Sequence, residues 1–223
     1  MKFFRLGYFE WGKIKPEVWI EKWAELFLTD KERREDDQVY ESLFQKKGQL
    51  SAEDFEQIGR WKEGCLIKEP GKEHGRWNPR TPVAYGVWME ARGTLPPLLV
   101  HGNFDDNFAK KFLEDWSKKT FAIQGKGGKV RNVRFGLARA STLLHFISGG
   151  RFPIYDSLVW YALHRMGTPL PWEMTVNVDA YLKTFYPLFY SIASRCGLSN
   201  SPEDLRRLDN ALRCYGRRER RTC

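Results

Sequence analysis

An apolar stripe that stops at two consecutive glycines constrains the fold of this chain most. The stripe recurs at helical spacing and consists of Leu137, Ala140, Leu143, Leu144 and Ile147. This spacing predicts a helix with one buried face, and Gly149 and Gly150 are typical residues for its end. Pro153 then favours extended chain, and Asp156 with Ser157 favours a new helix start. The sequence therefore predicts two helices joined by a short extended link.

The same periodicity predicts helices along much of the remaining chain. Their starts or ranges are Pro16, Ser51 with a capping box to Asp54, 105–117, 178–194 and 202–215. Residues 64–82 contain several Pro and Gly residues and predict loops, which bound a short segment over 83–91. At 223 residues with 15% aromatic content, the chain is long enough for one domain or two lobes. We expect a mostly α-helical protein.

Cysteine spacing and hydropathy favour a cytoplasmic location. The four cysteines, at positions 65, 196, 214 and 223, form no C-x-x-C pair and no spacing suited to zinc or an iron–sulfur cluster. Free thiols in a reducing compartment are the simplest interpretation. No window approaches eighteen uninterrupted apolar residues, and the first residues carry charges where a signal peptide is apolar. We expect no membrane insertion, no export and no metal.

The positive charge is concentrated in the second half of the chain. The formal net charge is +9, and residues 120–223 hold 16 Lys and Arg against 7 Asp and Glu. No acidic residue occurs between Asp115 and Asp156. The basic residues in this gap include Lys126, Lys129, Arg131, Arg134, Arg139 and Arg151. A polyanion such as nucleic acid is the natural partner of this surface, and the alternative is a basic face that serves solubility alone.

The glycine before the apolar stripe predicts a phosphate-binding turn. Gly136 leads into the predicted helix, whose first N–H groups have no partner within the helix and lie at the positive end of its dipole. Arg134, Arg139 and Ser141 would flank a phosphate bound there. We also expect nucleic-acid contacts from Lys126 and Arg131.

Asp156 is a single carboxylate in surroundings otherwise suited to an anion. A helix cap is one explanation, with a stabilisation of about 1 kcal/mol. The chemical explanation is cleavage of an N-glycosidic bond, in which the sugar becomes cationic. A carboxylate about 4 Å from that charge contributes about 4 kcal/mol at an effective dielectric constant near 20. This energy corresponds to roughly 10³ in rate.

These residues resemble a known family. The string ARASTLLHFISGGRFPIYDSLVW, a glycine turn and helix followed by a Pro-containing loop and an Asp at a helix start, resembles the helix-hairpin-helix DNA glycosylase superfamily. It is most similar to bacterial proteins described as 8-oxoguanine DNA glycosylase-like. The resemblance covers residues 131–160 and, more loosely, 104–215. The usual Gly-x-Gly of the hairpin is reduced here to Gly136, with Arg134 at the position of the other glycine.

The resemblance implies a two-lobed helical architecture with a helix-hairpin-helix element around 131–140. The parts would be an N-terminal lobe without assigned role (1–103) and a glycosylase-like lobe (104–215). The remaining residues, 216–223, contain four arginines with little to bury, and their composition predicts a mobile basic tail. Gly136 would donate to a phosphate of double-stranded DNA, and Asp156 would be the catalytic carboxylate. Such enzymes flip a base out of the duplex and hydrolyse its bond to the sugar, here as a monomer without a cofactor.

The resemblance leaves the substrate and the form of the chemistry open. The base is an 8-oxoguanine-like lesion or a bulky modified base of phage DNA, the latter as an antiphage defence. Lys129 and Lys126 are the candidates for the lysine nucleophile of bifunctional members, which add AP-lyase activity. Their glycine-rich surroundings favour phosphate contacts instead, with water activated near Asp156.

Three further residues are candidates for a base pocket, and two other functions remain open. Tyr155, Trp160 and His145 would line the pocket, although each also suits a protein core. The first alternative function is a helix-hairpin-helix protein that binds DNA without catalysis. The second is a helical scaffold whose basic face has no partner.

Overall fold

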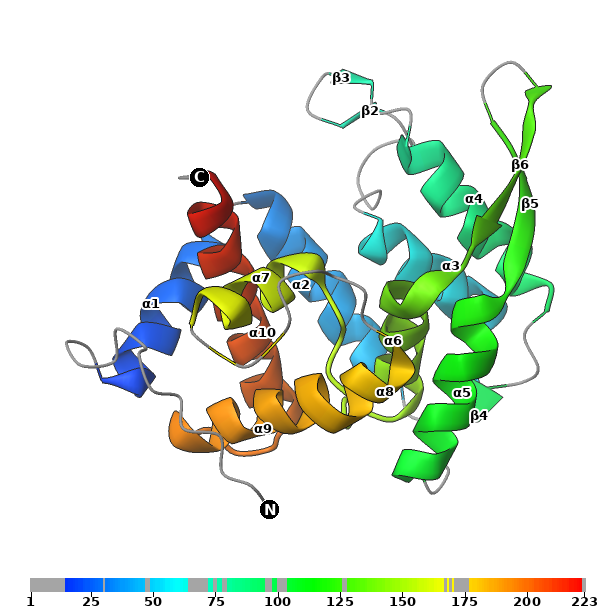
Figure 1. Ribbon diagram of the computed structural model, residues 1–223. Helices are drawn as coiled ribbons and strands as arrows, with labels where there is room; N and C mark the ends of the chain where they lie inside the picture. Colours follow the sequence, from blue (N-terminus) through cyan, green and yellow to red (C-terminus); the bar gives the residue numbers. More distant parts are fainter. Residues whose placement is uncertain are drawn as a thin grey trace. The chain divides into compact units, whose positions relative to one another are not determined.

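The computed structural model confirms a mostly α-helical protein (Figure 1). It describes residues 15–29, 31–46, 49–63, 72–73, 76–77, 80–94, 98–99, 104–125, 128–166, 168, 170 and 177–221. Within these ranges, no helix is both long enough and apolar enough to cross a membrane.

The helices account for most of the described residues. They are α1 (Pro16–Leu28), α2 (Lys31–Phe44), α3 (Ala52–Lys62), α4 (Arg80–Arg92), α5 (Asp106–Lys118), α6 (Gly136–Ile147), α7 (Ser157–Arg165), α8 (Val178–Ala180), the π-helical turn η3 (Tyr181–Phe185), α9 (Tyr186–Arg195) and α10 (Pro202–Arg221). The strands form three antiparallel pairs. They are β1 (Gln49–Leu50) with β4 (Leu98–Leu99), β2 (Lys72–Glu73) with β3 (Arg76–Trp77), and β5 (Thr120–Gln124) with β6 (Val130–Arg134).

Several helix ends match the sequence signals. Pro16 begins α1, and Ser51 forms with Asp54 the capping box that opens α3. Asp156 caps α7, and the Gly149–Gly150 pair, at φ of 62° and 84°, follows α6. These signals are local interactions between a side chain or a φ angle and the nearest helix turn, which explains why they are readable without tertiary structure.

The chain divides into two compact units. The terminal unit comprises Met1–Arg33 and Arg151–Cys223, and the central unit comprises Arg34–Gly150. The expected boundary at 103/104 falls inside the central unit. The reason is packing, because α3 and α4 precede that boundary yet pack against α6 and β5, which follow it.

Phe135 lies at the centre of the central unit. It is fully buried, and its ring lies 5.0 Å from Trp88 of α4, 5.3 Å from Trp116 of α5 and 6.2 Å from Phe121 of β5, measured between ring centroids. Glu63 adds a polar connection, because its Oε1 accepts from Trp88 Nε1 at 2.9 Å and from Arg139 Nε of α6 at 2.7 Å. The helices on either side of the β5–β6 hairpin are thereby joined in one core.

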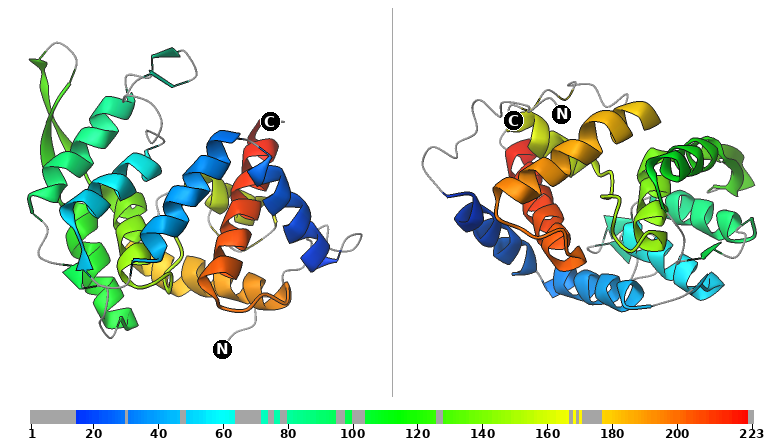
Figure 2. Two further views of the ribbon diagram at one scale, coloured as in Figure 1. Left: turned by 180° about the vertical axis from the view of Figure 1, so that it is seen from behind. Right: turned by 90° about the horizontal axis from the view of Figure 1, so that it is seen from below.

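The segment between α5 and α6 contains two strands that the sequence did not predict. Strands β5 and β6 pair as an antiparallel hairpin that runs beside α4 (Figures 1 and 2). Phe121 and Ile123 alternate with exposed residues along β5 and are buried. This period of two favours a strand, and it lets the hairpin pack one face against α4.

In the terminal unit, α10 packs against both α1 and α7. Trp19 and Trp23 of α1 meet the ring of Tyr215 edge-on, at centroid distances of 5.5 and 5.4 Å. On the side of α7, Gly216 permits a close approach, because a Cβ there would collide with the Leu158 carbonyl. The expectation of a mobile tail over 216–223 is therefore wrong through Arg221, since α10 continues to that residue.

A π-helical turn interrupts the helix that runs from α8 to α9. The Tyr186 N–H donates to the Tyr181 carbonyl, five residues earlier, where an α-helix would use the fourth. The next residue, Pro187, has no N–H, and in a regular helix its ring would clash with the carbonyl of Lys183. Widening the preceding turn accommodates this proline without ending the helix.

Candidate functional site

Asp156 stands at the junction between an extended link and a helix. The link begins at residue 151 and ends at Asp156, whose backbone is extended with φ of −132° and ψ of 141°. Its Oδ1 accepts from the Leu158 N–H at 2.7 Å. This bond orients the carboxylate at the positive end of the α7 dipole. About 17% of the side chain remains exposed, so the carboxylate is held in place and is still accessible to solvent.

The other carboxylate oxygen faces an arginine of α10. Arg213 Nε lies 3.9 Å from Asp156 Oδ2, which is an ion pair too long for a hydrogen bond. The pair joins α7 to α10 across a long sequence separation. Sequence patterns gave no indication of Arg213, because its partner depends on how α10 packs.

Two tyrosines hold the link that leads to Asp156. Tyr181 Oη donates to the Pro153 carbonyl at 2.6 Å, and Tyr190 Oη donates to the Arg151 carbonyl at 2.6 Å. Burial raises the pKa of Tyr181 well above its ordinary value. Burial, and then the neighbouring Tyr186, raise the pKa of Tyr190 to about 12. Both hydroxyls therefore stay protonated at neutral pH and remain donors. Sequence reasoning missed both residues, since neither lies near Asp156 in the chain.

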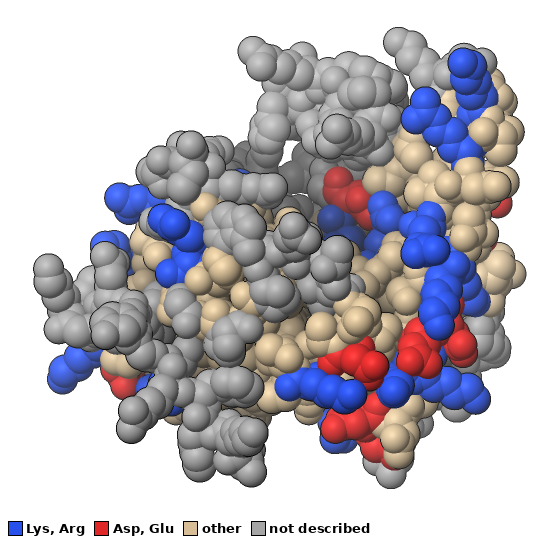
Figure 3. All heavy atoms as spheres, in the orientation of Figure 1, with Lys and Arg blue, Asp and Glu red and all other residues tan. Residues whose placement is uncertain are grey.

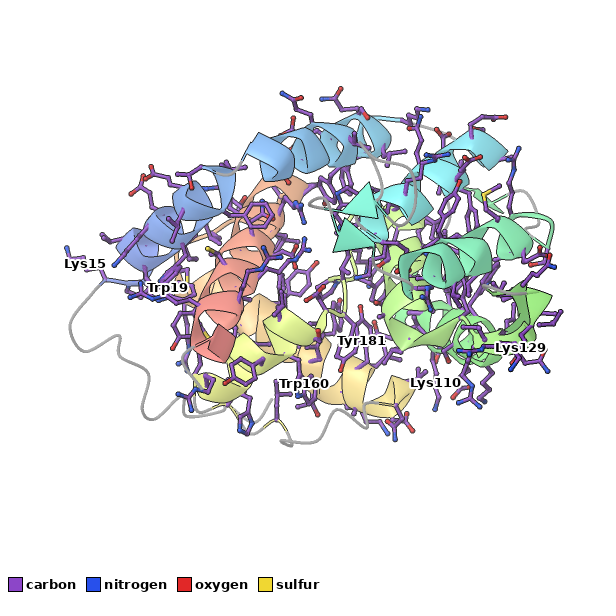
Figure 4. All side chains as sticks on the ribbon, turned by 90° about the horizontal axis from the view of Figure 1, so that it is seen from above. Lys15, Trp19, Lys110, Lys129, Trp160 and Tyr181 are labelled. Atoms are coloured by element: carbon purple, nitrogen blue, oxygen red, sulfur yellow. The ribbon has the colours of Figure 1, made fainter. Side chains whose placement is uncertain are left out.

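Aromatic side chains pack behind the carboxylate. The Tyr155 ring lies 5.8 Å from Trp160 and 5.6 Å from Phe185, and Trp160 stacks on Phe185 at 6.3 Å. Burial, followed by the Asp156 carboxylate, raises the pKa of Tyr155 to about 12. Tyr155 and Trp160 are buried in the terminal unit, and Figure 4 labels Trp160 on α7 and Tyr181 on η3. Their stacking on a flipped base stays a prediction.

The predicted phosphate contacts lie in the central unit, and three of them are exposed. Lys129 directly precedes β6, while Arg131 and Arg134 lie on β6. Lys129 is labelled in Figure 4, and Figure 3 shows Lys and Arg side chains gathered along this hairpin. Among the described residues, no acidic side chain forms an ion pair with these three cations. Lys126 lies outside the described residues.

The other predicted contacts have internal partners or a special backbone. Gly136 begins α6 at φ of 80°, a conformation that favours glycine, and the N-cap residue Phe135 makes no side-chain capping bond. Arg139 pairs with Glu63 at 2.7 Å and donates to the Phe135 carbonyl at 3.0 Å. Ser141 is buried and donates to the Ala138 carbonyl. Arg139 and Ser141 therefore stabilise the core around α6 in this structure.

His145 also belongs to the central core. It is buried, and its Nε2 lies 2.6 Å from the hydroxyl of Tyr40 on α2. The predicted site residues are thus divided between the two units. Asp156 is grouped with Tyr155, Trp160 and Arg213 in the terminal unit, whereas Lys129, Gly136, Arg139, Ser141 and His145 belong to the central unit.

The described residues include no group of three His, Cys, Asp or Glu side chains placed to hold a metal ion. Comparison with protein-family models, with curated proteins and with solved structures finds no match to this chain.

Proposed function

We propose that this protein is a DNA glycosylase that flips a damaged or modified base out of the duplex and excises it. The observation that supports the proposal most is the fixed carboxylate of Asp156. It is anchored by the Leu158 amide and stands at the end of a link that Tyr181 and Tyr190 hold. A carboxylate that is already oriented and ionised needs no reorganisation when positive charge develops nearby.

The chemistry follows from that carboxylate. As the bond between C1′ and the base nitrogen breaks, its electron pair leaves with the base, and the sugar becomes cationic. Asp156 stabilises this cation by about 4 kcal/mol at about 4 Å and an effective dielectric constant near 20. Water then attacks C1′ and transfers a proton to the carboxylate; this proton passes through solvent to the released base anion, and Asp156 is ionised again. Substrates of this proposal are an 8-oxoguanine-like lesion or a bulky modified base of phage DNA.

The test compares two aspartates that cap helices in the same way. Asp105 caps α5 and accepts from the Phe108 N–H at 2.7 Å, as Asp156 accepts from Leu158. Asp156→Asn and Asp105→Asn both keep a good capping residue. We expect Asp156→Asn to lower excision about 10³-fold and Asp105→Asn to leave it unchanged, across duplexes with oxidised, alkylated and phage-type modified bases. Equal excision by both variants would mean that Asp156 only caps its helix.

A separate experiment tests whether Lys129 or Lys126 acts as a covalent nucleophile. Lys129 is exposed and lies on no helix, which favours a phosphate contact over a role as nucleophile. We expect borohydride to trap no covalent adduct with substrate DNA. An adduct that disappears in Lys129→Ala or in Lys126→Ala would instead identify an AP-lyase nucleophile.

A second candidate function is DNA binding without catalysis. The Arg213–Asp156 pair favours it, because a guanidinium 3.9 Å away already neutralises part of the negative charge. Under this alternative, no duplex in the panel loses a base, and binding still weakens with salt. A log–log slope near −4.5 is expected for about five neutralised phosphates.

A further inference from the structure

The β5–β6 hairpin has an outward face whose composition suits the edges of DNA bases. The register pairs Thr120 with Arg134, Ala122 with Asn132, and Gln124 with Val130. All six side chains are exposed, including Val130 at 64%. Because side chains alternate along a strand, these three pairs share one face. They supply two amides, a guanidinium, a hydroxyl and small apolar groups, and residues 120–134 contain no acid.

The opposite face anchors the hairpin to the helices. Phe121 and Ile123 are buried, and β5 packs against α4. Gly86 of α4 allows this approach, since a Cβ there would lie 2.9 Å from Ile123 Cγ2. At the base, the Phe135 N–H donates to the Lys119 carbonyl at 2.8 Å. The outward face is thereby presented by a supported strand pair and not by a free loop.

The outward amides are available to a partner. Within the part of the chain that the structure describes, the side chains of Gln124 and Asn132 make no hydrogen bond, and neither does that of Arg134. Arg131 is exposed although it pairs with buried Ile123, so its charge is accessible to solvent. Lys129 adds a second exposed cation beside β6.

We propose that this outward face enters the major groove of duplex DNA and contacts base edges. The proposal rests on the proposed function only in taking DNA as the partner. A B-DNA major groove is about 12 Å wide and admits a two-stranded β-ribbon, whose strands are about 4.8 Å apart. Asn132 and Gln124 match the donor and acceptor of adenine, Arg134 matches guanine, and Val130 suits a thymine methyl group. Lys129 and Arg131 contact the flanking phosphates.

The groove geometry selects DNA over duplex RNA. The major groove of A-form RNA is deep and narrow, and side chains cannot read it. The consequence for a glycosylase is a preference for the sequence around the target base, set by the hairpin and not by the site of excision.

The experiment uses the full chain with Asp156→Asn, so that excision of a base does not compete with binding. A pool of unmodified duplexes with randomised sequence is bound and the retained fraction is sequenced, and affinities for selected duplexes follow from fluorescence anisotropy. We expect a sequence preference that Asn132→Ala reduces about tenfold without changing the salt slope. Asn132→Asp, which keeps the side-chain size but removes the donor, is expected to abolish the preference. Gln57→Ala, an exposed amide on α3, is the matched control and should change nothing.

The phosphate contacts give a different signature. Lys129→Ala and Arg131→Ala should weaken binding to all sequences alike, and each should make the salt slope shallower by about 0.9. An A-form RNA duplex of the selected sequence should bind at least tenfold more weakly than the DNA. Circular dichroism of each variant serves as the control for an intact fold.

Three outcomes would overturn the proposal: no sequence preference in the parent protein, an unchanged preference in Asn132→Ala and Asn132→Asp, or equal binding of the RNA duplex. These outcomes are independent of excision. If Asp156 proves essential for excision while the hairpin variants keep the parental preference, the groove contact alone is wrong. If no base is ever excised but the hairpin variants behave as expected, the glycosylase function alone is wrong.

Discussion

At the scale of single residues, Asp54 shows how neighbouring groups stabilise a buried carboxylate. Asp54 is almost fully buried, yet it caps the start of α3 and pairs with Lys46. Burial alone would raise the pKa of Asp54, but the hydrogen bonds from Lys46 and Ser51 outweigh it and the net pKa is lowered. The ionised form is therefore the one that the fold stabilises.

This arrangement predicts a pH dependence of stability. A carboxyl whose pKa is lower in the folded state contributes stability above its unfolded pKa, near 4, and loses it as the pH falls through the folded pKa. Asp54→Asn should lower the free energy of unfolding at pH 7 by about 1 kcal/mol and flatten its decline below pH 4. Urea unfolding from pH 7 to pH 2.5 measures both. Asp106→Asn, exposed on α5, is the control, and an equal effect of both substitutions would contradict the assignment.

A second residue-scale prediction concerns Cys196. This thiol is buried after α9, and burial, followed by the nearby Glu17, raises its pKa to about 12. Because the thiolate is the reactive form, iodoacetamide at pH 8 should leave Cys196 unmodified in the native protein and modify it in urea. Mass spectrometry of the peptides measures the labelled fraction. Rapid labelling of Cys196 under native conditions would contradict its burial.

At the scale of elements, close helix packing depends on one glycine. Gly216 of α10 faces the Leu158 carbonyl of α7, which is backbone and cannot rotate away. Gly216→Ala should lower the free energy of unfolding by about 1–3 kcal/mol, the usual range for overpacking. Gly93→Ala is the control, because its nearest neighbour, the Glu90 carbonyl, lies 3.8 Å from the added Cβ. Thermal unfolding of both variants tests the difference, and similar melting temperatures would contradict the packing.

The elements also show which sequence signals were readable. Helix starts at Pro16, Ser51 and Asp156 follow local rules and were predicted. The strands β5 and β6 were missed, although Phe121 and Ile123 alternate with polar residues in the required period of two. Residues 124–129 are glycine-rich and indicate a turn. The alternating runs on either side of this turn are only five residues long, so they are a weaker signal than the helical periodicity of the neighbouring segments.

At the scale of the whole molecule, the terminal unit joins segments from both halves of the chain. Tyr215 of α10 meets Trp19 and Trp23 of α1, and Arg218 lies over the Trp23 ring at 5.5 Å from its centroid. Pairing of such distant segments closes a long loop, which slows folding more than it lowers stability.

This arrangement predicts which regions lose protection from amide hydrogen exchange together. Tyr215→Ala removes both ring contacts and should increase amide hydrogen exchange in α1 and α10 in concert, while α5 and α6 of the central unit keep their protection. Tyr215→Phe retains the ring and should behave nearly like the parent protein. Mass spectrometry of deuterated peptides measures this directly. Loss of protection confined to α10 would show that α1 does not depend on it.

The amino-acid sequence by itself determined the helical class, the helix caps, the position of Asp156 at a helix start and the excess of positive charge. Each of these depends on neighbours within a few residues or on composition, so it is local information. Only the tertiary structure decided that Arg213 faces Asp156, that Tyr181 and Tyr190 hold the link, and that residues before 104 share a core with those after it. Those contacts join residues far apart in the chain, and packing of the whole core selects them from many compatible pairings.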